Sequence, residues 1–142
     1  MPYDPMMVAP MRDELTQLGF QELRRPEDVD REIARPERIL LVVNSVCGCA
    51  AGVARPGVAM SLKHPGAPRR LATVFAGQDV EATARARGYF GGLPPSSPQV
   101  AILEGGKLLF MLQRHEIEGR TAEQVAAALT AAYERLAQKT TV

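Results

Sequence analysis

The stretch Arg38–Pro56, RILLVVNSVCGCAAGVARP, decides the fold. It begins with RILLVVN, an aliphatic and β-branched run that is typical of a strand buried on both faces of a sheet. Ser45 follows as a candidate N-cap, and the residues after the cysteine pair are rich in alanine and favour a helix. Pro56 is expected to kink or restart that helix. The stretch therefore predicts a central strand that leads into a helix, with Cys47 and Cys49 at the junction.

Two helices are expected before this strand. Apolar residues at helical spacing predict an amphipathic helix over residues 7–18, with Pro10 tolerated only in its first turn. Its expected buried face consists of Met7, Met11, Leu15 and Leu18. After a connection over residues 20–25, Pro26 begins a second short helix that ends near residue 35. Residues 1–36 are therefore expected to form an N-terminal helical extension.

Strands and helices alternate after the cysteine pair. The expected elements are a strand over residues 71–76, a helix over residues 80–89 capped by Asp79, and two strands over residues 99–103 and 107–113 joined by a turn at residues 104–106. Thr121 and Gln124 have the spacing of a capping box at the start of a final helix. The buried face of that helix is expected to comprise Val125, Leu129, Tyr133 and Leu136.

This order of elements predicts an α/β fold, in which a thioredoxin-like mixed β-sheet is flanked by helices. A strand, a cysteine pair at the head of a helix, and a later proline-led hairpin with a closing helix follow one another as in thioredoxin. A single domain over residues 1–142 is expected, with residues 37–137 as its core.

Charge and composition narrow the classes of partner. Seventeen Lys and Arg balance sixteen Asp and Glu, so neither nucleic acid nor a membrane surface is an expected partner. The first thirty residues lack the pattern of a secretory signal or membrane anchor, and a cytoplasmic location is expected. In that compartment two cysteines are more often catalytic or metal-binding than a structural framework.

The cysteine spacing predicts thiol-disulfide exchange. A helix N-terminus stabilises a thiolate, so Cys47 is the expected nucleophile. Cys49 is the expected resolving thiol, because a neighbouring thiol attacks at a very high effective concentration. Gly48 between them gives the backbone freedom to close a small, strained disulfide ring. Asn44 and Ser45, which end the strand, are expected to support this site.

Two other interpretations of the pair remain open. A structural disulfide of this size contributes only about 1.6 kcal/mol before strain is subtracted. Alternatively, two thiolates could join His64 or His115 at a metal, as in a non-catalytic thiol-based metal carrier, or the pair could belong to a redox-sensing interaction module. The spacing disfavours metal, because paired zinc cysteines usually have two to four residues between them. No metal or nucleotide cofactor is therefore expected.

Two further segments are candidates near the site. In a thioredoxin-like fold the proline before the hairpin faces the active cysteine, so Ser97-Pro98 is predicted to be a cis bond beside Cys47. Residues 114–116, Arg-His-Glu, follow the last strand and are interpreted as a solvated loop, with a role in holding substrate left open.

Four segments give this chain its likeness to a known family. They are VVNSVCGCAAGVARP at residues 42–56, VFAGQDVEATARARGYF at 74–90, PPSSPQVAIL at 94–103 and RHEIEGR at 114–120. With these segments the chain resembles the bacilliredoxin family over nearly its whole length. The resemblance implies a thioredoxin-like protein that reduces mixed disulfides between proteins and the small thiol bacillithiol, with some disulfide-isomerase character.

The resemblance also implies roles and partners. Cys47 matches the family nucleophile, which takes bacillithiol from S-thiolated client proteins, and Cys49 matches the resolving cysteine. The chain has no third cysteine. Regeneration is therefore expected to use Cys49, a free low-molecular-weight thiol or a reductase.

Overall fold

A five-stranded mixed sheet lies at the centre of the protein in the computed structural model, which describes residues 2–139. The strands are β1 (Gln21–Glu22), β2 (Arg38–Asn44), β3 (Arg70–Phe75), β4 (Gln99–Glu104) and β5 (Lys107–Leu112), in the spatial order β1-β3-β2-β4-β5. The first three are parallel to one another, whereas β4 is antiparallel to both β2 and β5. The mixed α/β sheet predicted from the sequence is confirmed.

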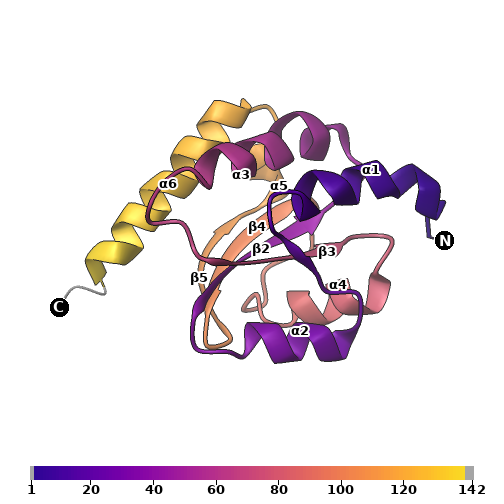
Figure 1. Ribbon diagram of the computed structural model, residues 1–142, viewed down its shortest axis with the longest axis horizontal. Helices are drawn as coiled ribbons and strands as arrows, with labels where there is room; N and C mark the ends of the chain where they lie inside the picture. The colour runs from indigo at the N-terminus through magenta and orange to yellow at the C-terminus, as the bar shows by residue number, and fades with distance from the viewer. Residues whose placement is uncertain (1, 140–142) are drawn as a thin grey trace.

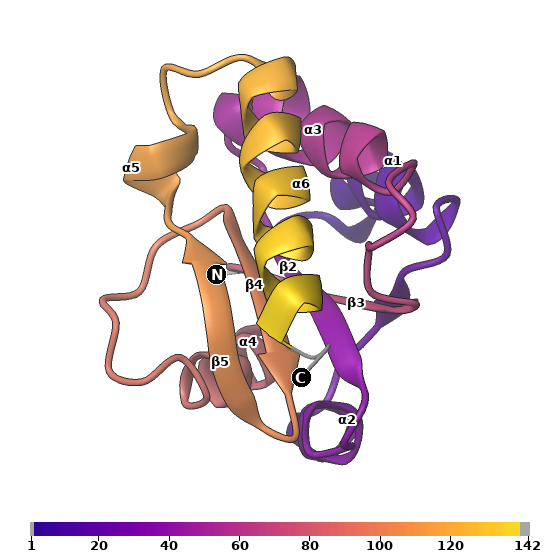
Figure 2. The same cartoon turned by 90° about the vertical axis from the view of Figure 1, so that its left-hand side faces the viewer.

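Helices cover both faces of this sheet (Figure 1). They are α1 (Pro5–Thr16), α2 (Pro26–Ile33), α3 (Arg55–Ser61), α4 (Val80–Arg87), α5 (Arg114–Ile117) and α6 (Ala122–Lys139), with a π-helical segment, η1 (Ala50–Ala54), directly before α3. Helices α1, α3 and α6 pack on one face, and α2 and α4 pack on the other. Figure 2 shows α6 lying along the sheet and α5 beyond the end of β5.

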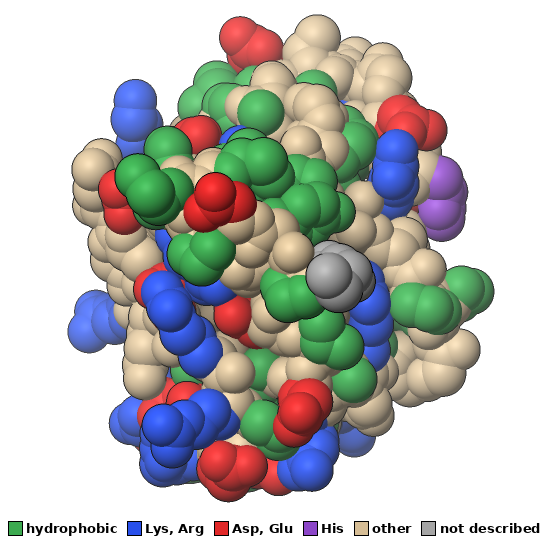
Figure 3. Space-filling view, turned by 90° about the vertical axis from the view of Figure 1, so that its right-hand side faces the viewer, with side chains coloured by type: hydrophobic (Ala, Val, Ile, Leu, Met, Phe, Trp, Pro, Cys, Tyr) green, Lys and Arg blue, Asp and Glu red, His purple; other side chains and the backbone are tan. Residues whose placement is uncertain are grey.

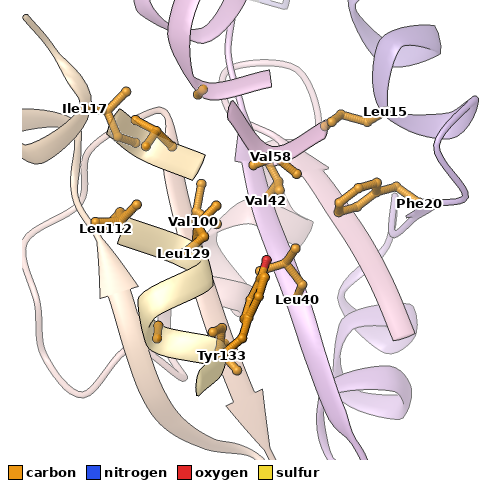
Figure 4. Packing of buried hydrophobic residues seen from close by; sticks show 14 of the residues in the cluster. Leu15, Phe20, Leu40, Val42, Val58, Val100, Leu112, Ile117, Leu129 and Tyr133 are labelled. Atoms are coloured by element: carbon orange, nitrogen blue, oxygen red, sulfur yellow. The ribbon is translucent and has the colours of Figure 1, made fainter. Parts of the chain in front are cut away.

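The alternation of side chains along β2 builds a core on each face of the sheet. Leu40 and Val42 point to the α1, α3 and α6 side, where Figure 4 shows them near Val58, Leu129 and Tyr133. Their neighbours Ile39, Leu41 and Val43 belong to the cluster on the α2 and α4 side. Both faces of β2 are therefore buried, as its uninterrupted aliphatic sequence predicts.

The candidate site lies at one edge of the sheet, meaning the edge formed by the ends of the strands and not by an outer strand. Strands β2 and β3 end there, because they run in parallel, and β4 begins there because it is antiparallel to β2. Pairing of Val43 with Gln99 and of Val100 with Leu112 brings the end of β2, the start of β4 and the end of β5 to this edge. The loops after β2, before β4 and after β5 therefore share one side of the molecule.

The first helix differs from its prediction. It begins at Pro5, because the Asp4 carboxylate caps it by accepting the Met6 N–H at 2.9 Å and proline suits the first position. Pro10 consequently lies in the helix interior rather than in the first turn. The predicted buried face is also partly wrong, because α1 buries Val8 and Leu15 whereas Met7 and Leu18 are exposed.

Three other local predictions needed correction. The connection over residues 20–25 contains β1, which pairs with β3. Asp79 precedes α4 but does not cap it, since its carboxylate binds Arg12 and accepts the Phe75 N–H. The loop predicted at residues 114–116 is the short helix α5, which has a capping box between Gln113 and Glu116.

Two predictions about the later helices are confirmed. Thr121 and Gln124 form the predicted capping box, with reciprocal hydrogen bonds of 2.9 and 3.1 Å between side chains and backbone N–H groups. Pro56 lies where η1 gives way to α3, so the helix restarts there as predicted. Proline lacks an N–H and crowds the carbonyl four residues earlier, which explains why the preceding turn is wider than an α-helical turn.

Candidate functional site

Cys47 and Cys49 lie directly after β2, and both are partly exposed free thiols. The Cys49 N–H donates to the Cys47 Sγ at 3.4 Å. The Cys47 carbonyl accepts from the N–H groups of Ala50 and Ala51 at 3.0 and 3.3 Å, and so begins the helix. The predicted junction of strand, cysteine pair and helix is therefore present, and the Cys47 sulfur accepts a backbone N–H at the start of the helix.

The two thiols have opposite pKa shifts. The pKa of Cys47 is lowered, first by a hydrogen bond from the Cys49 side chain and then by the Cys49 N–H, the Arg114 charge and the Ala50 N–H, against the opposing effect of burial. The pKa of Cys49 is raised, by burial first and then by its hydrogen bond and charge repulsion with Cys47. Cys47 is therefore the thiol of the pair that ionises more readily, and Cys49 is the one that holds its proton more tightly.

Arg114 contributes to the site from α5, and the sequence interpretation underestimated it. Its positive charge is one of the causes that lower the pKa of Cys47. The side chain pairs with Glu118, with 3.0 Å between Nη2 and Oε2. Because α5 follows β5 at the edge where β2 ends, residues far apart in sequence meet here. A basic residue just after the last strand of a predicted hairpin was the available signal.

Asn44 and Ser45 support the loop that carries the cysteines. Asn44 is buried, its Nδ2 donates to the Met11 carbonyl at 3.1 Å, and its Oδ1 accepts the Ser45 N–H at 2.9 Å. The Ser45 Oγ accepts the Cys47 N–H at 3.1 Å, which is the N–H contact of an N-terminal cap. At Gly48 an added Cβ would meet no atom within 4 Å, so the reduced structure does not itself require glycine there.

The Ser97-Pro98 bond is cis, as predicted, and Pro98 is buried directly before β4. Ser96, which precedes this bond, is held by three contacts: its carbonyl accepts from Arg87 at 2.7 Å, its Oγ donates to the Gln113 Oε1 at 2.9 Å, and the same Oγ accepts the Arg114 N–H at 3.3 Å. Pro98 lies at the same edge of the sheet as Cys47, but direct contact between the two stays a prediction.

A pocket of about 430 Å³ opens at this edge beside α5. Its lining is formed by Leu93, Pro94, Ser96, Met111, Gln113, His115 and Glu116. Both apolar and hydrogen-bonding groups are present, which is typical of sites for small organic molecules. His115 thus lines this pocket, whereas His64 lies against Glu134 of α6.

A metal held by the cysteine pair would need further ligands close to it. Within residues 2–139, no three or more His, Cys, Asp or Glu side chains cluster as metal ligands would.

Among the same residues, no helix combines the length and apolar character needed to cross a bilayer.

A partly exposed cysteine of lowered pKa after a central strand, with a second thiol two residues later, defines a thiol-disulfide oxidoreductase of the thioredoxin fold. The fold is similar to the thioredoxins of Fasciola hepatica (TM-score 0.57, 18% identity, 82% of this chain and 98% of that one) and Trypanosoma brucei brucei (TM-score 0.57, 16% identity, 84% and 91%). The family described as disulphide isomerase matches residues 3–137.

Sequence relatives confirm the family. The chain is 52% identical to a bacilliredoxin of Koribacter versatilis, over 94% of this chain and 92% of the relative. It is 50% identical to one from Geobacillus kaustophilus, over 94% of this chain and 92% of the relative, and 53% identical to one from Salinibacter ruber, over 94% and 81%. The chain belongs to the bacilliredoxin family.

Proposed function

We propose that this protein removes a small thiol from S-thiolated client proteins. The Cys47 thiolate attacks the small-thiol sulfur of the mixed disulfide, and the client leaves as a thiolate that takes up a proton. The Cys49 thiol then loses its proton and attacks the Cys47 Sγ, which releases the small thiol and leaves a Cys47–Cys49 disulfide. The mixed disulfide gains two electrons and becomes the client thiol and the free small thiol, and the cysteine pair loses those two electrons.

The observation that carries this proposal is that the two partly exposed thiols have opposite pKa shifts. Cys47 has a lowered pKa and is partly exposed, which favours its thiolate and leaves it accessible for the first attack. Cys49 has a raised pKa, which disfavours its thiolate and makes it the weaker competitor for the first attack. Once Cys47 is consumed in a mixed disulfide, the hydrogen bond and charge that raised the pKa of Cys49 are gone, which favours the second attack.

The surroundings of the pair support two kinds of substrate. The pocket beside α5, lined in part by Gln113 and His115, the chain neighbours of Arg114, offers space for the body of a small thiol. Exposed apolar side chains at the start of α1, Tyr3, Met6 and Met7, offer contact area for a protein. Figure 3 shows hydrophobic side chains gathered on the face of the molecule that carries the start of this helix.

Family membership supports bacillithiol as the small thiol and the cytoplasm as the location. The proposed cycle uses no metal or nucleotide cofactor, since both steps are sulfur displacements. A reductase or a second molecule of small thiol resets the disulfide. Disulfide isomerase activity belongs to the same proposal, because a thiolate that attacks mixed disulfides also attacks protein disulfides.

Separate substitution of the two cysteines tests the proposal. With a client carrying a bacillithiol mixed disulfide, Cys47→Ser abolishes release of the thiol. Cys49→Ser still attacks once and accumulates bacillithiol on Cys47, seen as one added thiol mass in intact-protein mass spectrometry. Release at the wild-type rate by the Cys47→Ser protein would refute the assignment of the nucleophile.

The metal-carrier alternative makes a different prediction for the same variants. A carrier would show stoichiometric metal in the purified wild type, equal loss of metal in both cysteine variants and no thiol release. Recovery of the Cys49→Ser protein from its own cells identifies the native thiol, because the mass added at Cys47 is that of the trapped compound. A mass other than that of bacillithiol would replace the substrate while leaving the chemistry intact.

A further inference from the structure

Arg55 is the one charged residue that is buried within residues 2–139, with 3% of its surface exposed. Its Nη1 donates to the Asn44 Oδ1 at 2.8 Å and to the Ser45 carbonyl at 3.0 Å. Its Nε donates to Glu14 of α1 at 3.1 Å. The guanidinium therefore joins α1, the end of β2 and the start of α3 beneath the cysteine loop.

These contacts reach Cys47 through a continuous chain of hydrogen bonds. The Asn44 Oδ1 that accepts from Arg55 also accepts the Ser45 N–H at 2.9 Å. Ser45 is thus held from both its N–H and its carbonyl, and its Oγ accepts the Cys47 N–H at 3.1 Å. The position of the Cys47 backbone, and hence of its sulfur relative to the Cys49 N–H, depends on this chain.

The π-helical segment explains how Arg55 reaches this position. The Arg55 N–H bonds to the Ala50 carbonyl, five residues earlier, instead of the fourth residue as in an α-helix. One extra residue in a turn rotates all later side chains by about 100° relative to those before it. The wide turn between the cysteines and Arg55 therefore sets the direction in which the guanidinium leaves the helix.

The ion pair of Arg55 does not explain its burial. Its one carboxylate partner, Glu14, is about half exposed, with 48% of its side chain accessible. Burial of a charge costs free energy, and a single partly solvated partner contributes little in return. The remaining contacts of Arg55 all go to the two residues that carry the cysteine loop.

We propose that Arg55 is a positioning residue for the Cys47 nucleophile: its buried guanidinium holds Asn44 and Ser45 so that the loop presents the Cys47 sulfur to the backbone donors at the start of the helix. This inference rests on the proposed function and adds the residue that holds the Cys47 loop in place. Arg114 acts on Cys47 directly through its charge, whereas Arg55 acts through the loop.

The test measures how the rate of Cys47 alkylation by iodoacetamide depends on pH, read by peptide mass spectrometry on reduced protein. Arg55→Met is expected to lower the Cys47 thiolate-to-thiol ratio near neutral pH by about five-fold, the effect of losing one hydrogen bond. Arg55→Lys keeps the charge and one donor, so it restores part of the loss. The matched control is Arg70→Met, because Arg70 binds Glu32 and the Glu37 carbonyl at the opposite edge of the sheet.

Ser45→Ala provides the second, milder variant. It removes the acceptor of the Cys47 N–H and is expected to slow alkylation in the same direction as Arg55→Met. Because Arg55 acts through Ser45, the double variant should lose less than the product of the two single effects. This comparison remains decisive if Arg55→Met does not fold, since Arg55→Lys then replaces it in the cycle.

The outcomes separate this inference from the proposed function. A wild-type pH profile in Arg55→Met, a wild-type profile in Ser45→Ala, or an equal shift in Arg70→Met would overturn the role of Arg55 even if the protein turns over substrate. A protein that releases no small thiol but shows the expected alkylation profiles would lose the proposed function and keep the positioning role.

Discussion

Replacement of Gly57 by alanine tests how closely the helix after the cysteine pair packs on α6. Gly57 is buried in α3. A Cβ at this position would lie 2.8 Å from the Val125 Cγ1 and 3.0 Å from the Ala122 carbonyl oxygen. Val125 is fully buried, and a backbone oxygen has little freedom to move, so α3 and α6 must separate to admit the methyl group.

The expected magnitude follows from two opposing effects. An extra methyl group in a well-packed core costs about 1–3 kcal/mol. Alanine in place of glycine in a helix returns up to about 1 kcal/mol. Gly57→Ala is therefore expected to lower the free energy of unfolding by about 1–2 kcal/mol, which corresponds to a fall in Tm of about 3–6 °C.

Urea unfolding followed by circular dichroism measures this change. Gly52→Ala is the matched control, because an added Cβ there meets no atom within 4 Å. The control is expected to keep wild-type stability or gain up to about 1 kcal/mol. A Gly57→Ala protein as stable as the Gly52→Ala protein would refute the close packing of α3 on α6.

Three further predictions concern the thiol pair. Cys49→Ala is expected to raise the pKa of Cys47, because it removes the side-chain hydrogen bond that lowers this pKa. Cys49→Ser keeps a hydroxyl donor and is expected to raise the pKa of Cys47 less. The rate of Cys47 alkylation as a function of pH measures both effects, and identical profiles for the two variants would contradict the assigned hydrogen bond. Arg114→Gln is expected to raise the pKa of Cys47 as well, so the alkylation rate of Cys47 rises only at higher pH. The difference from wild type should shrink in high salt, because the Arg114 side chain is solvated. A difference that persists in high salt would contradict a charge effect. Gly48→Ala is expected to leave the free energy of unfolding nearly unchanged but to slow closure of the Cys47–Cys49 disulfide. Oxidation of the reduced protein by a small disulfide measures the closure rate. Equal closure rates in the variant and the wild type would show that the glycine is not needed for ring formation.

The strongest sequence signals correspond to elements that local rules specify. The aliphatic run of β2 predicts burial on both faces, and the Thr121 and Gln124 pair predicts the start of α6. The cysteine pair was placed correctly at the junction of strand and helix, because this placement depends only on neighbouring residues. The order of elements was enough to predict the mixed sheet.

The errors arise where distant residues decide the structure. β1 has only two residues and exists because β3 lies beside it, so no local pattern marks it. Asp79 has the sequence position of a cap, yet Arg12 from α1 takes its carboxylate. Arg55 was not recognised as a site residue, since a charged residue in a helix is usually solvated and only the tertiary structure shows its burial.

The two borders of the sheet have a consequence for association with other chains. At one border β1 offers only two residues for pairing, and at the other β5 is interrupted by a bulge opposite Ile102 and Leu103. Short and bulged borders discourage the addition of a foreign strand. Addition of a strand from an unfolded chain or from a second copy is therefore disfavoured at both borders. The loops at the strand ends, which carry the cysteine pair, remain accessible to other proteins.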